Sequence, residues 1–300
     1  MIFTIRHRTA YRYAELVTLG PHRLMIRPRD SFDMQLRRAE LVSTPPASLR
    51  WMHDPLGNAI AIATFGAPTN LLEITSTLEI ERFDSTQPAF APPAATAFPI
   101  VYGAAEVPEL TPFVTPATDD PSLVLKAFMQ EPMAAAGQSG LDFLAGLNEK
   151  VHGHVSYARR DEEGTQAPVD TVERGTGSCR DMAWLFVECA RRAGFAARFV
   201  SGYLYDQATD AALGGLVGGG ATHAWAEIYV PETGWVEYDP TNLLVAGHAL
   251  LRVAVARTPE LASPISGTFT GSTGAFLGIE VSVEISSREA EAREAEAVAA

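Results

Sequence analysis

Residues 175–184, with the sequence GTGSCRDMAW, constrain the fold more than any other stretch because glycines give way there to a helical pattern. Ser178 is a preferred N-cap residue, and Asp181 stands three positions later, in the reciprocal position of a capping box. Cys179 is therefore predicted to be the first helical residue. Free backbone N–H groups and the positive end of the helix dipole favour a thiolate at that position. The stretch suits a nucleophilic cysteine.

Two alternating segments downstream, THAWAEIYV and WVEYD, predict a β-hairpin that carries a histidine and an aspartate. The PETG sequence between them is typical of a turn. A five-residue connection pairs Tyr229 with Trp235 and leaves His223 diagonal to Asp239 on one face of the hairpin. Diagonal neighbours lie about 7–8 Å apart at Cα, so the carboxylate can meet a tilted imidazole. A four-residue turn would place the two side chains on opposite faces.

Cys179, His223 and Asp239 occur in the order of a nucleophile, a general base and an orienting carboxylate. Three other carboxylates are rivals for the orienting role: Asp181, Glu227 and Glu237. The first is better used to cap its own helix. The two glutamates share the predicted face of the hairpin, so either could approach the imidazole if the strand register slipped by two residues.

Four short motifs resemble the bacterial transglutaminase-like superfamily, whose members are often assigned as cysteine proteases: GSCRD at 177–181, RFVSGYL at 198–204, THAW at 222–225 and DPT at 239–241. Residues 1–83 also resemble the β-sandwich that precedes the catalytic core in one branch of this family. The resemblance implies a papain-like core with the nucleophile at a helix N-terminus and an antiparallel sheet that carries histidine and aspartate. Position by position, it makes Cys179 the nucleophile, His223 the general base and Asp239 the residue that orients the imidazole.

The predicted elements favour an α+β protein. Short alternating segments predict an antiparallel β-sandwich over residues 1–83, and recurrent prolines mark residues 84–120 as a linker or an extended surface strap. A transglutaminase-like catalytic domain is predicted over 121–287, followed by an Ala/Glu tail at 288–300. Within the catalytic domain we expect helices at 121–129, 140–152 and 179–193, a loop at 159–176, and strands at 197–205 and 276–285.

The composition is that of an ordinary globular protein, with 47% hydrophobic and 20% charged residues. A formal net charge of −13 argues against nucleic acid and anionic membrane surfaces as partners. No apolar run approaches the ~20 residues that span a bilayer, and the N-terminus has no signal-peptide core, so we expect a cytoplasmic protein. Two cysteines are too few for a disulfide framework, and Cys189 is predicted to be a small core residue.

Other candidate site residues surround the proposed nucleophile. His152 and His154 would point the same way on a strand and could bind a metal, but they fit the end of a helix equally well. No carboxylate or second cysteine stands nearby at ligand spacing, so neither a metal nor a cofactor is predicted, and calcium is not implied. Tyr157 could supply a hydroxyl to an oxyanion or simply pack. The glycine-rich segment 206–220 before His223 is either a lid or a flexible loop.

The chemistry that fits this set is acyl transfer from an amide, in a peptide or a glutamine side chain, through a thioester on Cys179. Hydrolysis by a protease or amidase is favoured over transfer to an amine, and the substrate is expected to be a peptide or protein. The alternatives are a transglutaminase proper and a non-catalytic scaffold in which the core is a relic. An arylamine acyltransferase shares the triad, but the chain has no recognisable coenzyme A site.

Overall fold

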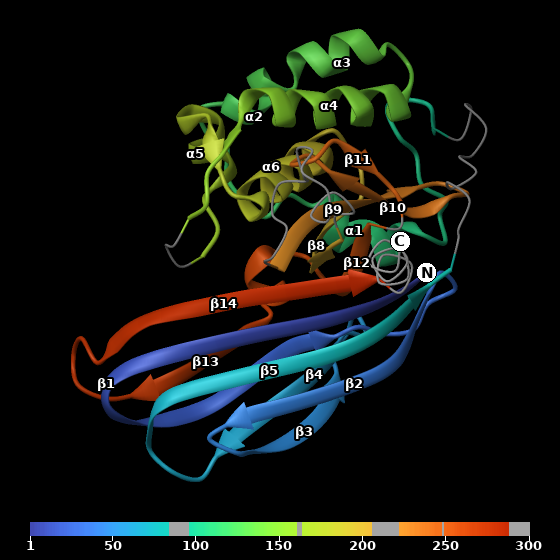
Figure 1. The fold of residues 1–300 in the computed structure, drawn as a ribbon. Helices are drawn as coiled ribbons and strands as arrows, with labels where there is room; N and C mark the ends of the chain where they lie inside the picture. The colour runs from blue at the N-terminus through green and yellow to red at the C-terminus, as the bar shows by residue number, and fades with distance from the viewer. Residues whose placement is uncertain (84–95, 161–163, 206–221, 248, 288–300) are drawn as a thin grey trace, which may run out of the picture.

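The computed structural model describes residues 1–83, 96–160, 164–205, 222–247 and 249–287. The protein is built in layers, as Figure 1 shows: a large antiparallel sheet, a second, five-stranded sheet, and a group of helices on the far side of the second sheet. The expected α+β architecture is observed.

The first layer is an antiparallel sheet organised around one long strand, β1 (Ile2–Arg27). Four further N-terminal strands join it in the order β2-β5-β1-β4-β3: β2 (Met34–Thr44), β3 (Ala47–His53), β4 (Ala59–Phe65) and β5 (Thr69–Arg82). The first part of β1 pairs with β5, whereas its last part pairs with β4. The region is therefore one bent sheet and not the predicted sandwich of two sheets, because a single strand runs through both parts.

Two strands from the end of the chain also join this sheet. β13 (Ile265–Thr270) and β14 (Phe276–Ser287) both pair with β1, with Phe3 opposite Ser287. The predicted bounds of the catalytic domain, 121–287, stay a prediction, and the last two strands inside them pair with the N-terminal strand β1. Alternation predicted the last strand correctly but could not tell which sheet would accept it, because strand pairing depends on tertiary contacts.

The second layer is an antiparallel sheet in the order β11-β10-β9-β8-β12. Its strands are β8 (Ala197–Leu204), β9 (Thr222–Val230), β10 (Gly234–Asp239), β11 (Leu244–Val245) and β12 (Leu250–Ala256). Tyr229 pairs with Trp235, so the predicted hairpin register is confirmed. Val230 also pairs with Gly234, which shortens the connection to residues 231–233 without changing that register.

Helix α6 (Cys179–Arg192) packs on one face of the second sheet and forms the largest hydrophobic core with it. The helix ends as predicted, at Ala193, and Gly194 follows with φ of +93°, a conformation that glycine adopts without strain. The other helices are α1 (Val107–Val114), α2 (Val124–Phe128), α3 (Gln130–Ala136), α4 (Gly140–His154), α5 (Pro168–Arg174) and the 3-10 helix η3 (Pro259–Ala262). Two short parallel strands, β6 (Ser156–Tyr157) and β7 (Thr176–Gly177), precede the start of α6.

The segment predicted as a linker is, in its described part, built into the core. Phe98 stacks on Phe143 with ring centroids 5.3 Å apart. The hydroxyl of Tyr102 accepts a hydrogen bond from the Ala196 N–H (2.7 Å) and donates one to the Tyr229 carbonyl (3.1 Å). Helix α1 follows, so prolines here mark an extended, packed segment. The polar loop predicted at 159–176 likewise contains α5.

Some predictions lie outside the described residues. They are the lid or loop at 206–220 and the Ala/Glu tail at 288–300. Among the described helices, none is both long and apolar enough to cross a membrane.

Candidate active site

The start of α6 is held by the carboxylate of Asp181. One oxygen accepts hydrogen bonds from the backbone N–H and the hydroxyl of Ser178, both at 2.8 Å. The other accepts from the Gln166 N–H (2.7 Å) and from Arg160 Nη1 (2.8 Å). Burial alone would raise the pKa of Asp181, but these bonds hold it below its usual value. Asp181 is therefore fully used in fixing the backbone before Cys179.

The two cysteines have different surroundings. Cys179 is the first residue of α6 and retains 7% of its surface exposed. Cys189 is completely buried, and burial raises the pKa of its thiol. Cys189 is therefore a core residue, as expected, and a buried neutral thiol of this kind is inert.

His223 and Asp239 meet in the interior, on the hairpin that the sequence predicted. His223 Nε2 lies 2.8 Å from Asp239 Oδ2, and both side chains are inaccessible to solvent. Asp239 Oδ2 also accepts from Asn242 Nδ2 (2.9 Å), and Oδ1 accepts from the Thr241 N–H (2.9 Å). Burial opposes ionisation of Asp239, but His223 and these donors hold its pKa below the usual value. The aspartate is thus an ionised acceptor with a fixed orientation.

The other imidazole nitrogen, Nδ1, is not bonded to Asp239. Nδ1 is buried and has no fully formed hydrogen bond to any described residue. The Cys179 side chain is nevertheless close enough to raise the pKa of His223. The two residues are therefore neighbours in the site, without a fully formed hydrogen bond between them.

The electrostatics of the site favour a charged imidazole. Burial would lower the pKa of His223, but the Asp239 carboxylate, and to a smaller extent Cys179, outweigh it and raise the pKa to about 10. The ring is therefore protonated at neutral pH.

Neither rival glutamate is available to His223. Glu227 is buried between two arginines, with Oε2 2.6 Å from Arg198 Nε and Oε1 2.7 Å from Arg252 Nη1. Glu237 lies opposite Glu227 in the hairpin, and among the described residues its ion pair is a longer one, 3.7 Å from Arg82 Nη2. Of the four carboxylates considered, Asp239 is the one bonded to the imidazole.

Two residues around His223 escaped the sequence analysis. The Trp225 ring stacks beside the imidazole, with centroids 6.0 Å apart and an interplanar angle of 27°. Gly202 pairs directly with His223, and a Cβ there would lie 2.3 Å from the Leu251 carbonyl oxygen and 2.6 Å from Trp225 Cη2. A glycine inside a predicted strand is the signal that could have identified this close approach.

Tyr157 belongs to the same neighbourhood. Tyr157, in β6, pairs with Gly177 of β7, and Gly177 lies two positions before Cys179. The tyrosine is 40% exposed. Burial raises the pKa of Tyr157, and the charge of Cys179 raises it further. A half-exposed tyrosine hydroxyl therefore belongs to the surroundings of the candidate nucleophile.

The two histidines considered as metal ligands have other partners. His152 and His154 lie at the end of α4, not on a strand. His152 Nδ1 is 3.1 Å from the Pro240 carbonyl, and His154 Nε2 is 2.8 Å from the Val172 carbonyl. Within the described parts of the chain, no group of three or more His, Cys, Asp and Glu side chains is placed to hold a metal.

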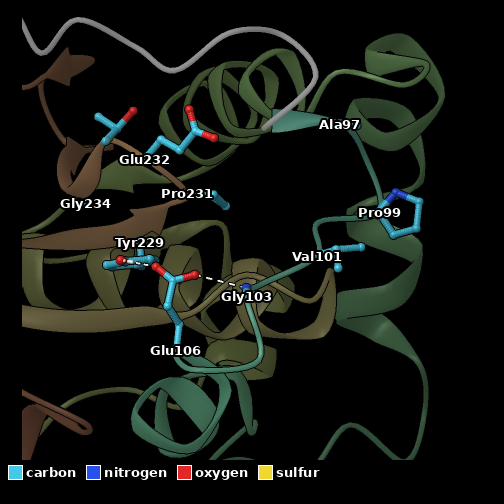
Figure 2. Close-up of a pocket in the computed structure, with 10 residues that line it drawn as sticks. Ala97, Pro99, Val101, Gly103, Glu106, Tyr229, Pro231, Glu232 and Gly234 are labelled. Carbon is cyan, nitrogen blue, oxygen red and sulfur yellow. Dashed lines mark hydrogen bonds between the residues drawn. The ribbon is translucent and has the colours of Figure 1, made fainter.

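A cavity of about 620 Å³ lies elsewhere, at the turn of the β9–β10 hairpin. Figure 2 shows Tyr229 and Glu106 hydrogen-bonded at its wall. His223 is the second residue of β9 and Tyr229 is near its end, so this cavity is at the opposite end of the strand from the imidazole. None of the candidate catalytic side chains lines it.

Comparison with known proteins identifies the class. Residues 128–240 match the transglutaminase-like superfamily, and residues 3–81 match the bacterial transglutaminase-like N-terminal region. The chain therefore contains a transglutaminase-like core and, before it, the N-terminal region of bacterial transglutaminase-like proteins. The recognition made from the four motifs is confirmed.

Related chains extend over nearly the whole length. An uncharacterized protein of Mycobacterium tuberculosis H37Rv is 27% identical over 306 residues, covering 94% of this chain and 92% of the relative. One from Mycobacterium leprae is 27% identical over 289 residues, covering 92% and 96%. A crystal structure from Cytophaga hutchinsonii, described as a putative cysteine protease, has a TM-score of 0.68 at 17% identity, covering 95% of this chain and 90% of that one. At this identity the likeness shows the fold alone.

Proposed function

We propose that this protein is a cysteine-dependent acyl-transfer enzyme that acts on an amide through a thioester on Cys179. One observation carries the proposal: an imidazole bonded to a buried carboxylate at 2.8 Å is in reach of a thiol at the first position of a helix. Nucleophile, base and orienting group are the parts that such chemistry requires. The transglutaminase-like core agrees with this assignment.

The first half of the reaction forms the thioester. The Cys179 thiolate attacks the amide carbonyl carbon, and a C–S bond forms while the carbonyl oxygen takes the negative charge. When the tetrahedral intermediate collapses, the C–N bond breaks, and His223 gives its Nδ1 proton to the departing amine. Asp239 holds Nε2 throughout, so the ring keeps its orientation in both protonation states.

Two donors are candidates for holding the oxyanion. The N–H of Cys179 is at the helix start and has no acceptor within its own helix. The Tyr157 hydroxyl, on the strand paired with the residues before Cys179, is the second candidate. Preorganised donors at such a position typically contribute about 10²–10³ in rate.

The second half of the reaction consumes the thioester. A water molecule gives a proton to neutral His223 and attacks the acyl carbon, which releases a carboxylic acid and restores the thiolate–imidazolium pair. A primary amine in place of water would yield a new amide. Hydrolysis of a peptide or a glutamine side chain remains the favoured outcome, and transfer to an amine is the alternative.

Mass spectrometry of peptide substrates tests the proposal. The protein is incubated with a glutamine-containing peptide library, with and without a primary amine such as methylamine. Backbone cleavage identifies a protease, a gain of about 1 Da identifies deamidation, and incorporation of the amine identifies a transglutaminase, at rates above the uncatalysed one. Cys179→Ala should abolish whichever product forms. Persistence of that product in Cys179→Ala would exclude the thioester mechanism.

A further inference from the structure

The segment that carries Asp239 is a tight hairpin with unfavourable backbone angles. β10 returns as β11, with Asp239 paired to Leu244 and the Ala246 N–H donating to the Glu237 carbonyl (2.9 Å). Leu243 and Ala246 have φ of 55° and 53°, a left-handed conformation that disfavours residues with a Cβ. Backbone of this kind persists where surrounding contacts hold it.

Arg82, the last residue of β5, reaches the open end of this hairpin from the other sheet. Its Nη2 donates to the Gly247 carbonyl at 3.0 Å and lies 3.7 Å from Glu237 Oε2. Its Nη1 lies 3.0 Å from Asp33 Oδ2, and the side chain is 3% exposed. Glu237 lies in the β10 arm of the hairpin, two residues before Asp239, and Gly247 follows β11, the other arm. One guanidinium therefore contacts both arms.

The opposite end of the hairpin is held from the helical layer. His152 Nδ1 lies 3.1 Å from the Pro240 carbonyl and 3.2 Å from the Thr241 carbonyl. Thr241 in turn donates its N–H to Asp239 Oδ1. The hairpin tip therefore has its own support, and the contribution of Arg82 is specific to the base.

Among the described residues, Arg82 is the ion-pair partner of Glu237. Burial and the facing carboxylate of Glu227 raise the pKa of Glu237 to about 8. Glu227 is already occupied by two arginines, whereas Glu237 Oε1 is buried and has no hydrogen bond to any described residue. Without Arg82, Glu237 and Asp33 would lose the cation that both contact, two positions from the orienting carboxylate.

We propose that Arg82 is a positioning residue for the His223–Asp239 pair. It holds the arms of the hairpin together from the N-terminal sheet, which keeps the Asp239 carboxylate aimed at the imidazole. This inference rests on the proposed function of Asp239. It gives the N-terminal region a part in the catalytic site, in place of a separate role as a binding module.

Kinetics of three variants test the inference: Arg82→Met, Arg82→Lys and the matched control Arg37→Met. Arg37 is paired with Glu81 on the exposed side of the same sheet. Arg82→Met should lower kcat about tenfold with KM unchanged, because a misaimed base slows chemistry more than binding. Arg82→Lys should recover part of the loss, and Arg37→Met should match the unmodified protein. If Arg82→Met does not fold, Arg82→Lys carries the comparison against the control.

A second measurement separates positioning from stability. NMR titration of the His223 imidazole reports its contact with Asp239 and needs no substrate. Loss of that contact in Arg82→Met should lower the titration midpoint by about one pH unit or more. An unchanged midpoint, with or without a lower melting temperature, overturns the inference. If the unmodified protein has no Cys179-dependent activity, the proposed function fails, and the titration still decides whether Arg82 aims the pair.

Discussion

Gly202 and His223 are direct partners in neighbouring strands, and the missing side chain of the glycine makes room for the Leu251 carbonyl and the Trp225 ring. A Cβ at position 202 would meet a backbone carbonyl and the Trp225 ring, both closer than real Cβ contacts allow. The imidazole is thus supported by its carboxylate on one side and by a tightly packed indole nearby. Four predictions follow from this site, and each can be checked on the intact chain.

Gly202→Ala should destabilise the protein by about 3 kcal/mol, because the added methyl group clashes with atoms that cannot move independently. Urea unfolding measures the change. Gly146→Ala is the matched control: its Cβ would lie 3.6 Å from the Pro132 Cβ, an ordinary contact inside helix α4. That change should be neutral or slightly stabilising. Equal losses in the two variants would contradict the packing described around His223.

Cys179 should react with iodoacetamide while Cys189 is spared. The first is at the edge of the site beside a protonated imidazole, whereas the second is buried with a raised pKa. Peptide mapping after partial labelling of the folded protein measures the ratio. Asp239→Asn should slow labelling of Cys179, because the imidazolium loses its counter-charge. Equal labelling of the two thiols would favour a non-catalytic scaffold.

Stability should fall as the pH rises from 8 to 10. The pKa of His223 is raised from 6.5 to about 10 on folding, so its contribution is complete below pH 6.5 and lost as the pH rises through 10. The pKa of Glu237 is also raised on folding, from 4.5 to about 8. Its contribution to stability is therefore lost in a lower range, as the pH rises from 4.5 to 8. Urea unfolding in a Cys179→Ala background removes thiol ionisation from the measurement. Asp239→Asn should flatten the profile above pH 8; an unaltered slope would show that the histidine is not responsible.

Asp181→Asn should cost about 2–3 kcal/mol of stability, because an amide cannot replace a buried charge that accepts four hydrogen bonds. It should also lower the rate of Cys179 alkylation, since the backbone before the thiol loses its anchor. Thermal melting and peptide mapping measure the two effects. Glu149→Gln, an exposed position on α4, is a control that should change neither.

The local features of the site could be predicted because each depends on residues close in sequence. Ser178 and Asp181 mark a helix start through capping chemistry, and the hairpin register follows from alternation and turn length. The spacing of Cys179, His223 and Asp239 then indicated which side chains to bring together. Their catalytic roles stay predictions until the variants are measured.

Only the tertiary structure decided which strands and charged side chains from distant segments pair with one another. Alternation predicts that Phe276 begins a strand but not that this strand pairs with β1, because every exposed sheet edge presents the same backbone groups. Nothing local indicates that Arg82 reaches Glu237 across two sheets, or that Arg198 and Arg252 occupy Glu227. Such pairings depend on how the sheets bend and stack, and burial then decides which charges must be matched.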